Sequence, residues 1–167
     1  MSYTGKKFPN ISVNAMNEMG DTFKINVLEE AQKKNKKVIL FWYPKDFTFV
    51  CPTELHAFQA ALPEFDKRNT IVIGASCDTA EVHFAWLSTP KDNGGIEGVT
   101  YPIIADSNRN LSNLLDILDI SEESYDQATG TLQVEGDNVT YRATYIIDEE
   151  GTVVHESVNH MPLGRNV

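Results

Sequence analysis

The sequence is most informative between positions 38 and 55, which read Val38-Ile39-Leu40-Phe41-Trp42-Tyr43-Pro44-Lys45-Asp46-Phe47-Thr48-Phe49-Val50-Cys51-Pro52-Thr53-Glu54-Leu55. The first six residues are apolar and β-prone, which predicts a core strand. Pro44 follows that strand, and Pro52 suits the first turn of a helix. Cys51 is therefore expected at a junction between a core strand and the N-terminus of a helix.

A thiol at such a junction is placed where an anion is favoured. The first backbone N–H groups of a helix have no partner within the helix, and the helix dipole adds positive charge there. Helix N-termini are among the sites that lower a cysteine pKa, and the thiolate is the reactive form. We therefore interpret Cys51 as a nucleophile. The alternative is a small buried hydrophobe, the usual role of a lone cysteine.

Pro44, Thr48 and Cys51 fit the pattern P-x-x-x-T-x-x-C. This pattern resembles the peroxidatic motif of the peroxiredoxins, and residues 46–55 are similar to the typical two-cysteine branch that includes bacterial alkyl hydroperoxide reductase. The resemblance implies that the Thr48 hydroxyl bonds the sulfur and the peroxide, and that Pro44 shields the thiolate from water. It implies a peroxidase for hydrogen peroxide and organic hydroperoxides. In such an enzyme Cys51 becomes sulfenic acid, and a thioredoxin-like or flavoprotein disulfide reductase supplies the electrons that recycle it.

Two arginines complete the implied site. The leaving oxygen of a peroxide gains negative charge, and arginine is always charged and rich in hydrogen-bond donors. Arg142 and Arg165 lie in segments that resemble the family's late strand and the turn beyond it. There the first arginine contacts the peroxidatic sulfur, and the second pairs with the glutamate of the cysteine helix, here Glu54. A charged residue beside an otherwise apolar strand is also unusual unless it is paired. The alternatives are the exposed face of an edge strand for Arg142 and a plain surface residue for Arg165.

The predicted strands and helices alternate along the chain. They are a hairpin within residues 8–28, a helix over 28–36, a strand over 38–43, a helix after Cys51, a strand over 70–76, a helix over 79–88, a strand over 102–105, a helix over 108–118 and strands over 140–147 and 152–158. Pro63 is expected to kink or interrupt the helix after Cys51. This order predicts an α/β protein with a mixed central sheet and helices on both faces. It resembles the thioredoxin-like fold of the peroxiredoxins, as one domain over residues 1–167.

The composition argues against several classes of protein. Hydrophobic residues make up 41% of the chain and charged residues 23%, which fits neither a disordered nor a membrane protein. The formal net charge of −10, with no basic face to offset it, argues against binding to nucleic acid. The N-terminal residues lack the apolar core of a secretory signal, and two cysteines fit a reducing compartment. We therefore expect a cytoplasmic protein.

The four histidines and the second cysteine, Cys77, indicate neither a cofactor nor a metal site. The four histidines lack metal-ligand spacing relative to the cysteines. No second cysteine occupies the C-x-x-C position after Cys51, which argues against a thioredoxin-like disulfide reductase. Cys77 follows a buried strand, so we expect it to be structural and not to form a disulfide with Cys51.

The resemblance also implies a homodimer, assembled further into a decameric ring. A second reason is the number of aromatic side chains near Cys51, which suggests more apolar surface than one small domain hides. These aromatics are Phe41, Trp42, Tyr43, Phe47 and Phe49. The alternative is that their rings fill the monomer core. Typical two-cysteine members continue into an arm with a resolving cysteine, whereas this sequence stops at Val167. We therefore expect either an absent segment or another thiol to resolve Cys51.

Two functions of other classes also fit the sequence. The first is a thioredoxin-fold scaffold or holdase in which Cys51 is secondary. The second is a redox sensor whose oxidised Cys51 signals to a partner. Repeated turnover with a thiol reductant separates these functions from a peroxidase.

Overall fold

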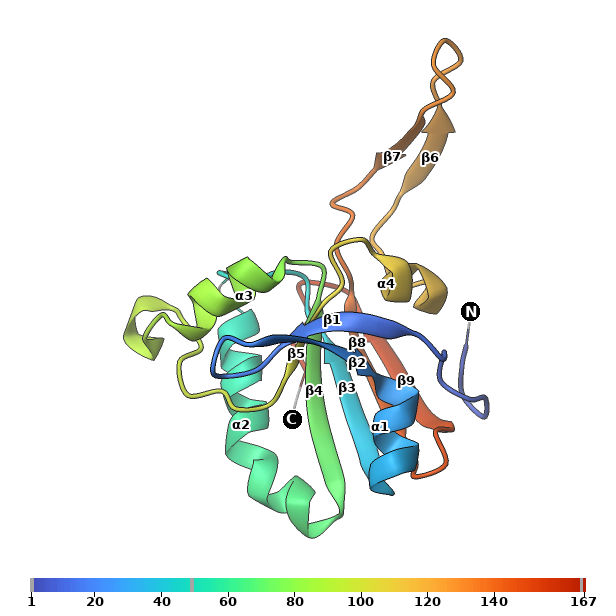
Figure 1. Cartoon of the computed structure of the whole chain (residues 1–167). Coiled ribbons are helices and arrows are strands. Elements are labelled where there is room, and N and C mark those ends of the chain that lie inside the picture. The colour runs from blue at the N-terminus through green and yellow to red at the C-terminus, as the bar shows by residue number, and fades with distance from the viewer. Residues whose placement is uncertain (1, 49, 166) are drawn as a thin grey trace.

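A computed structural model describes residues 2–48, 50–165 and 167. Its centre is a seven-stranded sheet with the strand order β2-β1-β5-β4-β3-β8-β9 (Figure 1). The strands are β1 (Ser12–Met16), β2 (Thr22–Asn26), β3 (Lys37–Trp42), β4 (Thr70–Ser76), β5 (Ile103–Ala105), β8 (Arg142–Ile147) and β9 (Val153–Asn159). The helices are α1 (Val27–Lys34), α2 (Cys51–Lys67), α3 (Ala80–Leu87), α4 (Asn110–Leu115) and a 3₁₀ turn, η1 (Lys91–Asn93). Strands β3, β4 and β5 run parallel and the remaining pairs antiparallel, so the predicted mixed sheet is confirmed.

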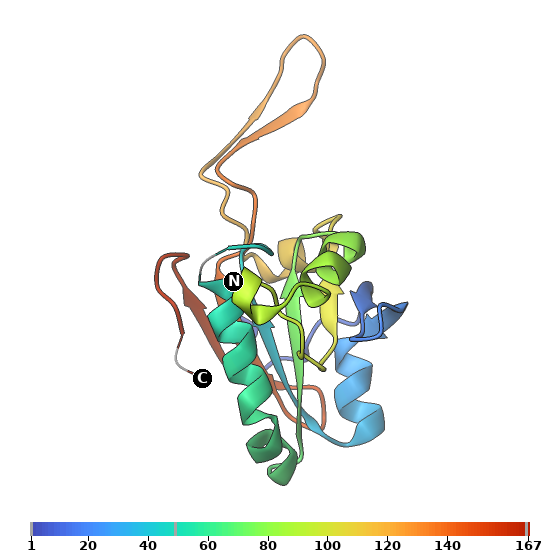
Figure 2. The same cartoon turned by 90° about the vertical axis from the view of Figure 1, so that its left-hand side faces the viewer.

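Strand β3 separates two hydrophobic clusters. Val38, Leu40 and Trp42 belong to the cluster that includes apolar residues of α1 and α4. Phe41 and Tyr43 belong to the other cluster, with residues of α2 and α3. Successive side chains of a strand point to opposite faces, so this uninterrupted apolar run is buried on both. The helices therefore cover both faces of the sheet, and Figure 2 shows α1 and α2 on opposite sides of it.

Local sequence sets the ends of α1 and α3. Asn26 caps α1 by accepting a hydrogen bond from the backbone N–H of Glu29 at 3.2 Å, and Asn35 ends the helix in the left-handed conformation, with φ 52°. Thr79 caps α3 in the same way through the N–H of Val82, at 3.3 Å. Side-chain oxygens at these positions satisfy N–H groups that the first helical turn leaves unpaired.

The structure differs from the predicted elements in two places. Helix α2 continues without interruption through Pro63 to Lys67. A second, two-stranded sheet of β6 (Glu122–Tyr125) and β7 (Leu132–Glu135) was not predicted, and it projects away from the main sheet (Figure 1). The residues of β6 are all exposed, so this hairpin lacks the buried apolar face that a sequence pattern reveals.

The predicted aromatic surface near Cys51 is largely wrong. Phe41, Trp42 and Tyr43 are each 0% exposed and fill the core of a single chain. Phe47 is 53% exposed, and Phe49 lies outside the described residues. The reason is β3 itself, because a central strand packed on both faces hides every ring it carries. Among the described residues, no helix combines the length and apolarity needed to cross a membrane.

Candidate active site

Cys51 is the first residue of α2. We call the described residues 43–48 and 50, which lie between β3 and α2, the β3–α2 loop. The Cys51 side chain is 0% exposed and packs with the cluster that includes Leu55 and Phe58 of the same helix. Pro52 stands in the first turn of α2, where the missing N–H costs no hydrogen bond. The strand-to-helix junction therefore holds the sulfur at the end of the helix that favours an anion.

Arg142 reaches the sulfur from β8. Its Nη1 donates to the Cys51 Sγ at 3.4 Å and to Glu54 Oε1 at 2.5 Å, while its Nε donates to the Met161 carbonyl at 2.7 Å. Strand β8 lies between β3 and β9, and Arg142 is only 4% exposed. The alternative of an exposed edge residue is therefore wrong for Arg142.

Arg165 holds the other oxygen of Glu54. Its Nε donates to Glu54 Oε2 at 2.6 Å, and its backbone N–H donates to the same oxygen at 3.1 Å. The guanidinium also donates to the Ala143 carbonyl, to the Thr144 hydroxyl and to the Trp42 carbonyl. The Arg165 side chain is 7% exposed, so the alternative of a plain surface residue is also wrong.

The charges of this cluster balance only when the sulfur is an anion. Arg142 and Arg165 contribute two positive charges, and Glu54, 4% exposed, contributes one negative charge. Burying an uncompensated charge is costly, whereas a thiolate at Cys51 brings the four groups to neutrality. The cluster is therefore built to hold an anion at the position of the sulfur.

Pro44 and Thr48 lie in the β3–α2 loop. Pro44 is buried, and Thr48 is partly exposed and donates its hydroxyl proton to the Lys45 carbonyl at 3.2 Å. The contact of Thr48 with the sulfur and the shielding by Pro44 remain predictions.

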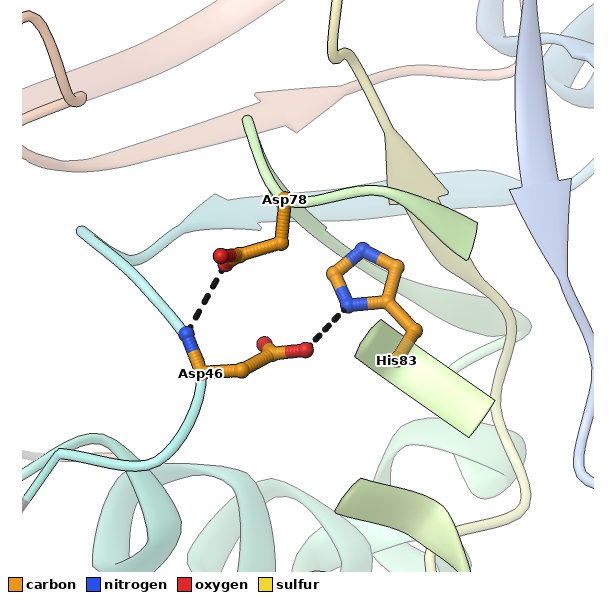
Figure 3. Close-up of side chains that lie close together, drawn as sticks. All are labelled: Asp46, Asp78 and His83. Atoms are coloured by element: carbon orange, nitrogen blue, oxygen red, sulfur yellow. Dashed lines mark hydrogen bonds and ion pairs between the residues drawn. The ribbon is translucent and has the colours of Figure 1, made fainter. Parts of the chain in front are cut away.

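Asp46 of the same loop forms a cluster with His83, which is also buried, and with Asp78, which is partly buried (Figure 3). This cluster was not predicted from the sequence. Ligand atoms of the three residues lie within 4.8 Å of one another, as a metal site requires. Each of these side chains is already engaged with protein groups, however. His83 Nδ1 contacts Asp46 Oδ2 at 2.6 Å, and Asp78 Oδ2 accepts from the Asp46 N–H at 2.8 Å and from the Ser76 hydroxyl at 2.7 Å. The geometry is that of a hydrogen-bond network that holds the loop.

A cavity of about 430 Å³ opens on the outer side of the first turns of α2. Pro52, Thr53, His56, Ala57, Lys91, Gly94 and Gly95 line it. Neither Cys51 nor Arg142 lines this cavity, so it is separate from the cluster around the sulfur. Cys51 is fully covered by its neighbours in this structure.

Comparison with known proteins agrees with this geometry. Residues 4–156 match the AhpC/TSA family. The chain belongs to this family. It is 37% identical to Peroxiredoxin-1 of Gekko japonicus over 166 residues, which cover 99% of this chain and 74% of that protein. It is 38% identical to alkyl hydroperoxide reductase C of Helicobacter pylori over 150 residues, 90% of this chain and 66% of that protein. Across eight of the curated relatives that it matches, the chain spans between 52% and 74% of their length.

Solved structures show the same fold. The reduced 2-Cys peroxiredoxin of Plasmodium vivax aligns with a TM-score of 0.84 at 33% identity, over 100% of this chain and 77% of that one. Prx1a of Plasmodium yoelii, modified at its N-terminus, forms an artifactual octamer and aligns with a TM-score of 0.77 at 31% identity, over 95% of this chain and 80% of that one. The predicted peroxiredoxin resemblance and thioredoxin-like fold are confirmed. The names of these relatives support the predicted class of enzyme, a thiol-dependent peroxidase.

Proposed function

We propose that this chain is a thiol-dependent peroxidase whose nucleophile is the Cys51 thiolate. The observation that carries the proposal is the 3.4 Å contact from Arg142 Nη1 to the sulfur, inside a buried cluster that is neutral only when the sulfur is an anion. Arg142 also needs no rearrangement to face charge that develops next to the sulfur, because Glu54 and the Met161 carbonyl already hold it.

The reaction is a displacement at oxygen. The thiolate attacks one oxygen of R–O–O–H, the S–O bond forms and the O–O bond breaks. The departing alkoxide or hydroxide takes up a proton and leaves as an alcohol or water. The sulfur is oxidised by two electrons to sulfenic acid, and the peroxide is reduced by the same two electrons. In this proposal Arg142 stabilises the leaving oxygen, Thr48 orients the peroxide and Pro44 excludes water, while Glu54 and Arg165 position Arg142.

Recycling needs two electrons from outside the site. Cys51 and Cys77 are both free thiols. The Cys77 sulfur forms a hydrogen bond with the Ser112 hydroxyl of α4. Cys51 instead packs with the hydrophobic cluster on the α2 face of the sheet. We therefore propose an external thiol, supplied by a thioredoxin-like or flavoprotein disulfide reductase, in a reducing compartment such as the cytoplasm. Because both hydrophobic clusters share one sheet, we also propose a single domain over residues 1–167.

We propose a homodimer that assembles further into a decameric ring. Strand β9 ends the strand order of the sheet. Backbone groups of Gly5 and Lys6 pair with Val153 at the start of its outer edge, and no described strand pairs with the rest of that edge. Val154 and Val158 of β9 are about half exposed. An apolar sheet edge is a ready surface for a second copy of the same chain.

The test of the activity is Cys51→Ser, with Cys77→Ala as the matched control. Serine is nearly isosteric with cysteine, but its hydroxyl stays protonated at neutral pH. We expect Cys51→Ser to lose peroxide consumption with dithiothreitol as reductant, and Cys77→Ala to keep it. Consumption by Cys51→Ser within tenfold of the parent rate contradicts the proposal. A parent that oxidises once and then stalls is a sensor, and a parent that never oxidises is a scaffold.

A further inference from the structure

The β3–α2 loop leads directly into Cys51 and carries a buried carboxylate in its middle. Asp46 is 5% exposed and precedes Cys51 by five residues in the β3–α2 loop. Asp46 Oδ2 contacts Nδ1 of His83 at 2.6 Å, and Asp46 Oδ1 accepts from the Tyr43 hydroxyl at 2.6 Å. The backbone N–H of Asp46 donates to Asp78 at 2.8 Å (Figure 3). We call Tyr43, Asp46, Asp78 and His83 the loop clamp.

The hydrogen bonds of the clamp require one extra proton. His83 Nε2 lies 3.0 Å from the Ile104 carbonyl, which only accepts, so Nε2 carries a proton. In a neutral imidazole Nδ1 is then a bare acceptor, and it faces a carboxylate oxygen at 2.6 Å. Two acceptors at that distance repel unless a proton lies between them. Asp46 and His83 therefore share one proton, on either the imidazole or the carboxyl.

The electrostatic surroundings act to keep that proton. Burial by itself lowers the pKa of His83, but the hydrogen bond and charge of Asp46 outweigh it, and the pKa of His83 is raised. Burial raises the pKa of Asp46, which His83 offsets only in part. The groups that face His83 are Asp46 and Tyr43 from the loop, Asp78 beyond β4 and the Ile104 carbonyl of β5. Strands β1 and β5, against which α3 packs, carry no titratable side chain.

Phe47, the residue after Asp46, has a strained backbone conformation that needs support from its neighbours. Phe47 has a φ of 58°, the left-handed region that a bulky side chain rarely adopts. Such strain persists only where neighbouring contacts enforce the conformation. Two residues of α3, one turn apart, supply those contacts. His83 holds Asp46, and the Trp86 ring lies 5.9 Å from the Phe47 ring, centroid to centroid.

We propose that His83 is a positioning residue for Cys51. Through Asp46 it holds the β3–α2 loop in the conformation that presents Thr48 and closes the sulfur against Arg142. Loss of the shared proton leaves two facing acceptors, so the clamp opens and the strained turn at Phe47 relaxes. This inference rests on the proposed function, since it assigns a part in the same reaction. It adds a residue of α3 that touches neither the sulfur nor the arginines.

The test compares His83→Gln with Asp46→Asn over a range of pH. In Asp46→Asn the amide N–H donates to the bare Nδ1 of neutral His83, and the amide oxygen still accepts from Tyr43. The clamp then closes without the extra proton. We expect the parent rate of sulfenic acid formation, followed by tryptophan fluorescence in a single turnover, to fall on the alkaline side. We expect Asp46→Asn to keep the parent rate within threefold at pH 7 and to lose that alkaline fall. His83→Gln should be at least tenfold slower at every pH.

The control is His56→Gln, which removes an imidazole bonded to the Gly95 carbonyl outside the clamp and should keep the parent profile. A parent-like profile in His83→Gln, or an unchanged alkaline fall in Asp46→Asn, overturns the proposal. If both variants fail to fold, the Cε1–H resonance of His83 in the parent decides. It should shift only above the ordinary pKa of about 6.5, and a transition at or below that value overturns the proposal. Failure of the proposed function is a separate outcome, because it is seen as turnover by Cys51→Ser.

Discussion

Arg142 is the residue that links the sulfur to Glu54, because one of its nitrogens faces both groups. Arg142→Met keeps much of the stem and removes the charge. We expect the rate of Cys51 oxidation by peroxide to fall by at least about 10²-fold, the usual cost of removing a preorganised charge donor. The measurement is the single-turnover rate at pH 7.

The matched control is Arg68→Met, which removes an exposed arginine at the C-terminal end of α2. It should change the rate by less than twofold. Equal rates in the parent and Arg142→Met would remove Arg142 from the mechanism.

Cys77 is a different kind of thiol. Burial raises its pKa from an ordinary value of 9.0 to about 11, although its hydrogen bond with Ser112 acts the other way. Between these values the unfolded chain has lost a proton that the folded chain keeps, so the free energy of unfolding falls as pH rises. We expect this fall to be about 1 kcal/mol between pH 9 and pH 10. The fall should be larger by this amount in Cys51→Ser than in Cys51→Ser/Cys77→Ala, because the buried tyrosines with raised pKa values contribute equally to both variants.

The urea midpoint at each pH measures this difference, and parallel curves for the two variants would contradict it. The same burial keeps Cys77 a thiol at neutral pH. Together with its place on the α4 face of the sheet, this leads us to expect no disulfide between Cys77 and Cys51 after one equivalent of peroxide. Mass spectrometry should find Cys51 alone trapped by dimedone.

At the scale of elements, α2 remains helical through an internal proline, Pro63. Pro63 lies four residues before the end of the helix, on its exposed side, and has no N–H to donate to the preceding turn. Pro63→Ala restores that donor, so we expect the free energy of unfolding to rise by about 1–3 kcal/mol. Urea denaturation measures it. The rate with peroxide should not change, because Cys51 lies twelve residues away at the other end of the helix. A less stable variant would show that the turn depends on the proline ring.

At the scale of the whole molecule, the proposed homodimer depends on the outer edge of β9. The aromatic residues of β3 no longer support it, because they are buried within one chain. If β9 joins two copies, Val154→Lys/Val158→Lys places like charges across a two-fold axis. We expect the parent to sediment at micromolar concentration as a dimer or larger ring, and the double variant as the 18.7 kDa chain. Met19→Lys, at an exposed turn residue, is the control and should sediment like the parent. A parent that sediments only at 18.7 kDa would refute the assembly.

Much of the fold was predictable because its signals are local. The apolar run of β3, the caps of α1 and α3 and the alternation of strands and helices depend on neighbours within a few residues. The polar hairpin of β6 and β7 was missed because it buries no face. An interruption of α2 at Pro63 was expected but is not found, because the tertiary context decides whether a helix accommodates a proline.

The sequence by itself determined the motif and, with it, the predicted nucleophile, since Pro44, Thr48, Cys51 and Pro52 all lie within nine residues of one another. Only the tertiary structure decided what surrounds the sulfur. Arg142 lies 91 residues from Cys51 along the chain and Arg165 lies 111 residues from Glu54, so their burial in one cluster depends on β8 lying beside β3. His83 meets Asp46 across 37 residues, and no pattern within α3 marks it. Ion pairs and shared protons form between side chains that the sheet brings together. The number of residues between two side chains in the sequence does not give the distance between them in space.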